Sequence, residues 1–151
     1  MAEHVVARDF GVTWGPNAPE AILLSDDGGK TVLALNAHHG DPDRRAVALV
    51  WSGSRYTCMA DPNDESISGH RLYASGLSDV LWGGVVRDSD LIRALETQNR
   101  VHPSHDPSRF ESLTHYVVLL KECVVEVVAQ ALSIQRSQGS TLHVATWAIG
   151  A

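Results

Sequence analysis

The feature that most constrains this fold is a valine-rich stretch in the last third of the sequence. Six of the twelve residues from Val117 to Val128 are valine. Valine loses χ1 freedom on a helix and is favoured in strands, so the stretch predicts a β-hairpin over residues 113–134 that turns at Lys121 and Glu122. A helix is the alternative, because helical spacing would align four polar residues into one stripe: His115, Glu122, Glu126 and Gln130.

Turn signals predict further strands in residues 1–60. Asp-Gly-Gly at residues 27–29 lies between two apolar runs and indicates one hairpin. Ser-Gly-Ser at residues 52–54 separates the run AVALVW from RYTCM and indicates a second hairpin.

The rest of the chain completes an α+β pattern. Residues 61–77 predict a polar loop with a short helix, and residues 88–101 predict the main α-helix, with Asp88 or Ser89 as its N-cap. Residues 137–151 predict an added strand or a loose tail. A length of 151 residues is that of one domain. We therefore expect a single α+β domain, mostly antiparallel β in a curved sheet or small open barrel, with one main α-helix.

The charge balance argues against a nucleic-acid-binding protein. The chain has 12 Lys and Arg against 18 Asp and Glu, a formal net charge of −6, whereas binding to phosphates depends on Lys and Arg. The first residues lack the pattern of a signal peptide, and no stretch approaches the roughly 18 apolar residues of a membrane span. We expect a cytoplasmic protein that binds neither nucleic acid nor membrane, with a homodimer left open.

Ionisable side chains are concentrated in the stretch ADPNDESISGHRLYASGL, residues 60–77. Asp64 or Glu65 near His70 would supply a proton donor and acceptor with separable pKa values, which general acid/base catalysis needs. The alternative is that Asn63 or Asp64 caps a short helix and His70 satisfies nearby loop carbonyls.

Other side chains would orient a substrate beside these groups. Arg71 could hold an anionic substrate group, and Tyr73 could donate a hydrogen bond to developing charge. His115 and Trp51 are further substrate-binding candidates. Glu126 lies between valines on one strand face in the hairpin interpretation, so burial would raise its pKa and make it a proton-transfer group.

A metal site is an alternative interpretation of the segment HPSHD. His102, His105 and Asp106 would offer two imidazoles and a carboxylate, which suit zinc or non-haem iron. The other interpretation of this segment is a proline-rich loop whose histidines are solvated or hydrogen-bonded to nearby backbone. The chain has no Gly-x-Gly-x-x-Gly, Walker or Gly-x-Ser-x-Gly motif, so the main expectation is an enzyme without a cofactor.

The stretch PNDESISGHRLYASGL, followed by a histidine-led hairpin with VVEVVA, resembles a family of small uncharacterised bacterial proteins. The resemblance covers Trp51 to Ala129 and rests on a Pro-Asn-Asp-Glu, Gly-His, Leu, Gly-Leu pattern with a later glutamate in the second hairpin strand. Arg71 stands where the family has proline, and Lys-Glu-Cys at 121–123 stands where it has His-Asp-Ser. The resemblance implies the hairpin and joins the polar stretch and Glu126 into one signature, but it implies no activity.

These observations lead to a hypothesis about function. We expect a bacterial enzyme that acts on a small molecule by general acid/base chemistry, as a lyase, cyclase, isomerase or hydrolase in secondary metabolism. The expected proton-transfer groups are Asp64, Glu65, His70 and Glu126. The alternatives are a non-catalytic module that binds a ligand or a protein, and a metal-dependent enzyme using His102, His105 and Asp106.

Overall fold

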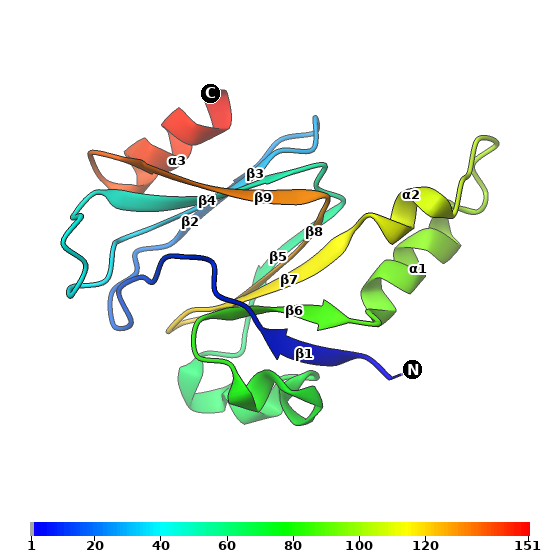
Figure 1. Ribbon diagram of the computed structural model, residues 1–151, viewed down its shortest axis with the longest axis horizontal. Helices are drawn as coiled ribbons and strands as arrows, with labels where there is room; N and C mark the ends of the chain where they lie inside the picture. The colour runs from blue at the N-terminus through cyan, green and yellow to red at the C-terminus, as the bar shows by residue number, and fades with distance from the viewer. Residues whose placement is uncertain (1) are drawn as a thin grey trace.

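The computed structural model describes residues 2–151, whose strands form two open antiparallel sheets (Figure 1). The five-stranded sheet has the order β1 (His4–Ala7), β6 (Gly83–Arg87), β7 (Thr114–Leu119), β8 (Val124–Ala129) and β5 (Tyr56–Ala60). The four-stranded sheet has the order β2 (Ile22–Ser25), β3 (Thr31–Leu35), β4 (Ala46–Ser52) and β9 (Ala131–Ser137). The expected α+β class with mostly antiparallel strands is confirmed.

Helices cover the outer faces of the two sheets. The α-helices are α1 (Asp90–Asn99), α2 (Ser108–Glu111) and α3 (Thr141–Gly150), and three 3₁₀ helices follow β5: η1 (Asp64–Gly69), η2 (Tyr73–Ser75) and η3 (Leu77–Asp79). The helix predicted at 88–101 is α1, and Ser89 is its N-cap, accepting a hydrogen bond from the Ile92 N–H. None of the helices in residues 2–151 combines the length and apolar character needed to cross a bilayer.

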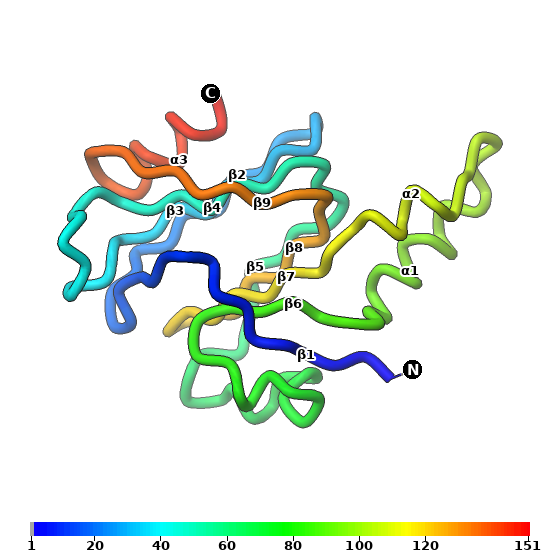
Figure 2. Tube along the Cα trace, in the orientation of Figure 1, coloured from blue at the N-terminus to red at the C-terminus, as the bar shows by residue number. Residues whose placement is uncertain are grey.

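The two sheets share one bent pair of strands. β8 runs into β9 with only Gln130 between them, and Figure 2 shows the chain passing directly from one sheet to the other. β8 pairs with β5, and β9 pairs with β4. The segment from β4 to β5 therefore also crosses from one sheet to the other, at Ser-Gly-Ser. The second predicted hairpin is therefore wrong. Gly53, with φ +62°, turns the chain from β4 into the other sheet, and the longer β8–β9 strand supplies the pairing for both halves.

The C-terminal segment, predicted as a tail or a strand, is the helix α3. Ser140 caps it by accepting the His143 N–H at 3.1 Å. Val144, Ala145 and Ala148 are buried against the four-stranded sheet, where their small side chains let the helix pack closely. Burial of this face stabilises the helix, because isolated helices of ten residues are marginal in water.

Three apolar layers hold the sheets and helices together. The main core lies between the sheets, where Trp14, Leu49 and Trp51 pack against Val125 and other valines of β7 and β8. A second layer lies under α3. The third covers the outer face of the five-stranded sheet, where the 3₁₀ segment packs at one end and α1 with α2 at the other (Figure 1). The polar residues of interest lie between these two coverings.

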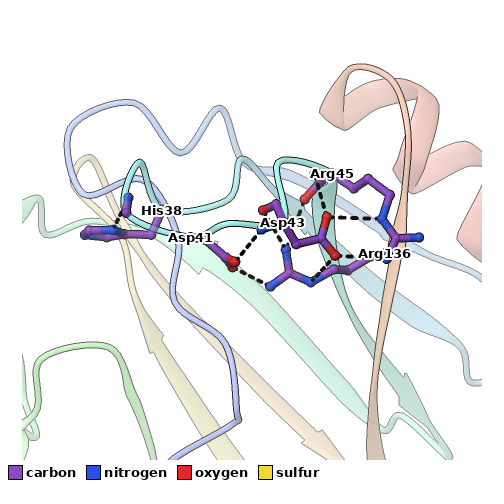
Figure 3. A network of polar contacts seen from close by, with 6 residues as sticks. His38, Asp41, Asp43, Arg45 and Arg136 are labelled. Atoms are coloured by element: carbon purple, nitrogen blue, oxygen red, sulfur yellow. Dashed lines mark hydrogen bonds and ion pairs between the residues drawn. The ribbon is translucent and has the colours of Figure 1, made fainter.

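A surface ion-pair network ties the loop after β3 to β9 (Figure 3). Arg136 donates a 2.6 Å hydrogen bond to Asp41, and Arg45 bonds both carboxylate oxygens of Asp43. These hydrogen bonds lower the pKa of Asp41, and that of Asp43 to about 2. The network fixes a loop and leaves its charges near solvent, unlike the buried cluster described next.

Candidate functional site

The outer face of the five-stranded sheet carries a buried cluster of polar side chains. His115 on β7 and Glu126 on β8 lie on the same face, because the register pairs Val117 with Glu126 and side chains alternate along each strand. His115 is fully buried and Glu126 is 7% exposed. The predicted hairpin, now confirmed, therefore places an imidazole and a carboxylate side by side in the protein interior.

The Glu126 carboxylate is surrounded by donors on both oxygens. Oε1 accepts from Nε2 of His115 at 2.8 Å and from one guanidinium nitrogen of Arg71 at 2.6 Å. Oε2 accepts from the other Arg71 nitrogen at 2.8 Å and lies 3.5 Å from Nε2 of His70. Glu126 thus accepts three hydrogen bonds, and of the about four acceptor positions of a carboxylate the remaining one faces His70.

The 3₁₀ segment brings His70 and Arg71 to the sheet. Asn63 caps η1 by accepting the Ser66 N–H, and His70 follows the last residue of η1. The side chain of Leu72 is fully buried in the outer apolar layer and anchors the segment. The Leu72 N–H donates to Nδ1 of His70 at 3.0 Å, so neutral His70 carries its proton on Nε2, facing Glu126.

These contacts set the charge states of the cluster. Burial alone would raise the pKa of Glu126, but the hydrogen bonds from His115 and Arg71 outweigh burial and lower the pKa to about 2. The expectation of a raised pKa at Glu126 is therefore wrong, and the carboxylate stays ionised. Burial lowers the pKa of His70, in opposition to the attraction of Glu126.

A cavity of about 250 Å³ opens beside the cluster, at the β5 edge of the sheet. Tyr56, Cys58, His70, Arg71 and Glu126 line it. Cys58 is the direct strand partner of Glu126, so its side chain lies on the same face. Burial, followed by the nearby Cys58, raises the pKa of Tyr56. The cavity presents a half-exposed guanidinium, a phenol and a thiol to a small molecule.

Four of the predicted residues meet in this cluster: His70, Arg71, His115 and Glu126. Asp64 and Glu65 do not. Both are exposed in the first turn of η1, where the Asp64 N–H donates to the Lys121 carbonyl, and nothing in the described residues bonds either carboxylate to His70. Their negative charges are favourable at the positive N-terminal end of η1. This placement agrees with the alternative that the stretch forms a capped short helix.

Tyr73 and Trp51 also lie away from the cluster. Tyr73 lines a separate, apolar cavity of about 410 Å³, together with Asp64 and Trp82. Trp51 is fully buried between the two sheets, where its ring lies 5.9 Å from that of Tyr116. Its predicted role in substrate contact is wrong, because the alternation along β4 directs it into the core.

The residues proposed as metal ligands do not converge. Nδ1 of His102 accepts the Ser104 N–H, Nδ1 of His105 bonds Asn99, and Asp106 accepts from Ser108. Across residues 2–151 no group of three or more His, Cys, Asp or Glu side chains is arranged to hold a metal ion. The backbone bond at His102 agrees with the alternative of a loop whose histidines bond nearby backbone, whereas His105 bonds the side chain of the last residue of α1.

Sequence reasoning missed one member of the cluster, Ser89. Its Oγ lies 2.7 Å from Nδ1 of His115, and the residue is 5% exposed. The sequence identifies Ser89 as a helix cap, but no local pattern links it to a histidine 26 residues further along the chain. The tertiary pairing of β6 with β7 creates that contact.

Comparisons with protein-family models, with curated proteins and with solved structures found no match to this chain. The geometry of the buried cluster is therefore the basis for assigning a function.

Proposed function

We propose that this protein is an enzyme that acts on a small molecule by general acid/base chemistry at the cluster around Glu126. One observation carries the proposal: an ionised carboxylate is buried in contact with two histidines, next to a cavity that a small molecule could enter. Burying charge is costly, and perturbed titratable groups beside a cavity are typical of catalytic sites.

The roles differ from those that the sequence suggests. Glu126 is a positioning residue, because it accepts three hydrogen bonds from His115 and Arg71 and its pKa is about 2. A carboxylate that holds one imidazole N–H stabilises the imidazolium formed when the other nitrogen takes a proton. His115 meets this description: Nε2 donates to Glu126, and in the neutral ring Nδ1 is an acceptor.

His70 and Arg71 complete the proposed site. Nδ1 of His70 is occupied by a backbone N–H, so His70 supports Glu126 and closes the cavity. The side chain of Arg71 is 53% exposed, and a guanidinium has five donors, of which Glu126 uses two. We infer that the remaining donors hold an anionic group of a ligand.

We also propose that the chain belongs to the family of small bacterial proteins that it resembles, and that it works in the cytoplasm. The two parts of the family pattern, His70 and Glu126, lie 3.5 Å apart. Arg71, in the position of the family's proline, adds the cation of the cluster. Cys58 and Cys123 are free thiols, which fits a reducing compartment.

The test compares model reactions in wild type and variants. Hydrolysis of p-nitrophenyl esters and α-proton exchange of small keto acids in D2O cover acyl transfer and proton abstraction. We expect at least one reaction to fall about 100-fold in Glu126→Gln and His115→Gln, the usual size of an acid/base contribution. Glu122→Gln, in the exposed turn of the same hairpin, is the control. Equal rates in wild type and both folded variants would refute the proposal.

A further inference from the structure

We propose that Ser89, His115 and Glu126 form a hydrolytic triad in which Ser89 is the nucleophile, acting on an ester or thioester that carries an anionic group. The inference rests on the proposed function, because it keeps His115 as the base and Glu126 as the residue that positions it. It adds the reaction type, the nucleophile and the substrate class.

The hydrogen bonds run in the order that a triad requires. Glu126 is ionised and only accepts, so Nε2 of His115 donates to it at 2.8 Å. The lone pair of the neutral ring is then on Nδ1, which lies 2.7 Å from Oγ of Ser89 and accepts its hydroxyl proton. A nucleophile bonded to a base that is itself oriented by a third group is the signature of nucleophilic catalysis.

Within residues 2–151, Ser89 connects the buried His115 to a cavity. His115 is fully buried, and its two ring nitrogens contact Glu126 and Ser89. Nε2 carries the proton that is bonded to Glu126, so the lone pair of the neutral ring faces Ser89. Ser89, by contrast, lines the cavity of about 830 Å³ between β6 and α1.

The lining of this larger cavity indicates the substrate class. Arg8 and Arg87 border it together with Asp88 and Glu111, and within residues 2–151 none of these four side chains forms a hydrogen bond or ion pair. Two free guanidinium groups attract a carboxylate or phosphate. Ile92, Phe110 and Leu113 add an apolar wall. We infer an acyl compound with an apolar part and an anionic end.

The reaction balances without a further reactant besides water. Oγ of Ser89 bonds to the carbonyl carbon, its proton moves to Nδ1 of His115, and the carbonyl electron pair moves to oxygen. The carbon–oxygen or carbon–sulfur bond to the leaving group then breaks, and His115 returns the proton to that group. Water attacks the acyl-serine, gives one proton to Nδ1, and releases the acid as Ser89 regains its hydroxyl proton.

The position of Ser89 before α1 favours this step. As the N-cap, Ser89 places the developing negative charge at the positive end of a ten-residue helix. Its Oγ also accepts the Ile92 N–H, but that bond is long, at 3.2 Å, so little is lost when the oxygen attacks.

The competing interpretation is that Ser89 only caps α1. Ser140 provides the matched comparison, because it caps α3 through the His143 N–H at 3.1 Å. In the described residues its Oγ makes that one bond, whereas Oγ of Ser89 also bonds a buried imidazole. Both serines cap a helix, so a difference in reactivity between them tests the triad independently of capping.

The test is labelling of the full chain with diisopropyl fluorophosphate, read by intact mass and peptide mapping. We expect one adduct, on Ser89, in wild type and in Ser140→Ala. Ser89→Asn keeps a good N-cap and should lose the adduct. His115→Gln should slow labelling about 100-fold. Hydrolysis of the mono-p-nitrophenyl ester of glutaric acid should also fall in Ser89→Asn, and Arg87→Gln should raise its KM more than that of p-nitrophenyl butyrate.

The outcomes separate this inference from the proposed function. An unlabelled Ser89, or ester hydrolysis that persists in folded Ser89→Asn, would overturn the triad. If Glu126→Gln still lost α-proton exchange in that case, the acid/base function would stand without it. Loss of neither reaction in Glu126→Gln would overturn both. Equal labelling of Ser89 and Ser140 would show that His115 does not activate Ser89 and would also overturn the triad.

Discussion

Nε2 of His115 lies 2.8 Å from Oε1 of Glu126, across the neighbouring strands β7 and β8. The register of the hairpin fixes this contact, because a slip of one residue would turn one of the two side chains to the opposite face. The rigid part of the site is thus built into the sheet. Arg71 and His70 are added from a 3₁₀ segment that is held by Leu72 and by the turn after it.

Replacing Glu126 should destabilise the fold. Glu126→Gln leaves His115 and Arg71 without their anionic acceptor, and breaking a buried charge pair costs about 3 kcal/mol, at the lower end for such pairs because Arg71 is half exposed. Urea unfolding at pH 7 measures the loss. Glu122→Gln, on the exposed turn, should change stability by less than about 0.5 kcal/mol. Similar losses in the two variants would show that the cluster adds nothing to stability.

The ionised state of Glu126 also predicts how stability changes with acid. Its pKa falls from 4.5 to about 2 in the folded chain, so the folded state binds fewer protons than the unfolded state between these values. The stabilisation is full above pH 4.5 and is lost as the pH falls toward 2. The loss amounts to about 3 kcal/mol.

Urea unfolding of wild type and Glu126→Gln between pH 7 and 2 tests this dependence. The difference in free energy of unfolding between the two proteins should be constant above about pH 5 and shrink steadily below pH 4.5. A difference that stays constant down to pH 2 would mean that Glu126 has an ordinary pKa.

His70 should act in the same direction at a higher pH. Burial lowers its pKa below 6.5, and the groups that face it are Glu126, Arg71 and His115. The folded state therefore binds fewer protons than the unfolded state as the pH falls through 6.5, and stability declines from there. His70→Gln should flatten the decline between pH 6.5 and 5.

The matched control is His143→Gln, which changes an exposed histidine on α3. The change in pH dependence should be larger in His70→Gln than in this variant. NMR titration of the His70 ring protons provides the direct reading. A midpoint above 6.5 would contradict the prediction and would mean that attraction to Glu126 outweighs burial.

Local signals in the sequence predict part of this fold. The valines of 117–128 specify the β7–β8 hairpin, and Ser89 marks the start of α1, because strand propensity and helix capping act over a few residues. The pairing of β4 with β9 could not be predicted, since it depends on a strand some eighty residues away that bends at Gln130. The cap at Ser140 was a usable signal for α3.

The candidate site could likewise be predicted only in part. The sequence predicts that His70 and Glu126 belong to one site, and Nε2 of His70 lies 3.5 Å from Oε2 of Glu126. The charge state of Glu126 could not be read from its valine neighbours. It depends on Arg71, which reaches the carboxylate from 55 positions earlier in the chain. The sequence does not predict Ser89 as a site residue, because its bond to His115 exists only in the tertiary structure.

The turn that holds the 3₁₀ segment gives the last prediction. Gly76 has φ +112°, and a Cβ there would lie 2.5 Å from the Val5 carbonyl oxygen in β1. Gly76→Ala should therefore destabilise the protein by more than about 1 kcal/mol, through both the backbone conformation and the clash. The substitution should also loosen the contact of Arg71 with Glu126, because the 3₁₀ segment that carries Arg71 must move away from β1.

Gly69→Ala is the matched variant in the same segment. A Cβ at Gly69 meets nothing within 4 Å, and its φ is not positive, so this change should be neutral or slightly stabilising. Urea unfolding compares the two variants, and the carboxyl 13C shift of Glu126 against pH reports the site. Weakening the Arg71 contact raises the pKa of Glu126, so the titration midpoint should rise in Gly76→Ala alone. No rise in Gly76→Ala would mean that the segment positions Arg71 without help from the turn at Gly76, and a rise of equal size in Gly69→Ala would mean that the effect is not specific to that turn.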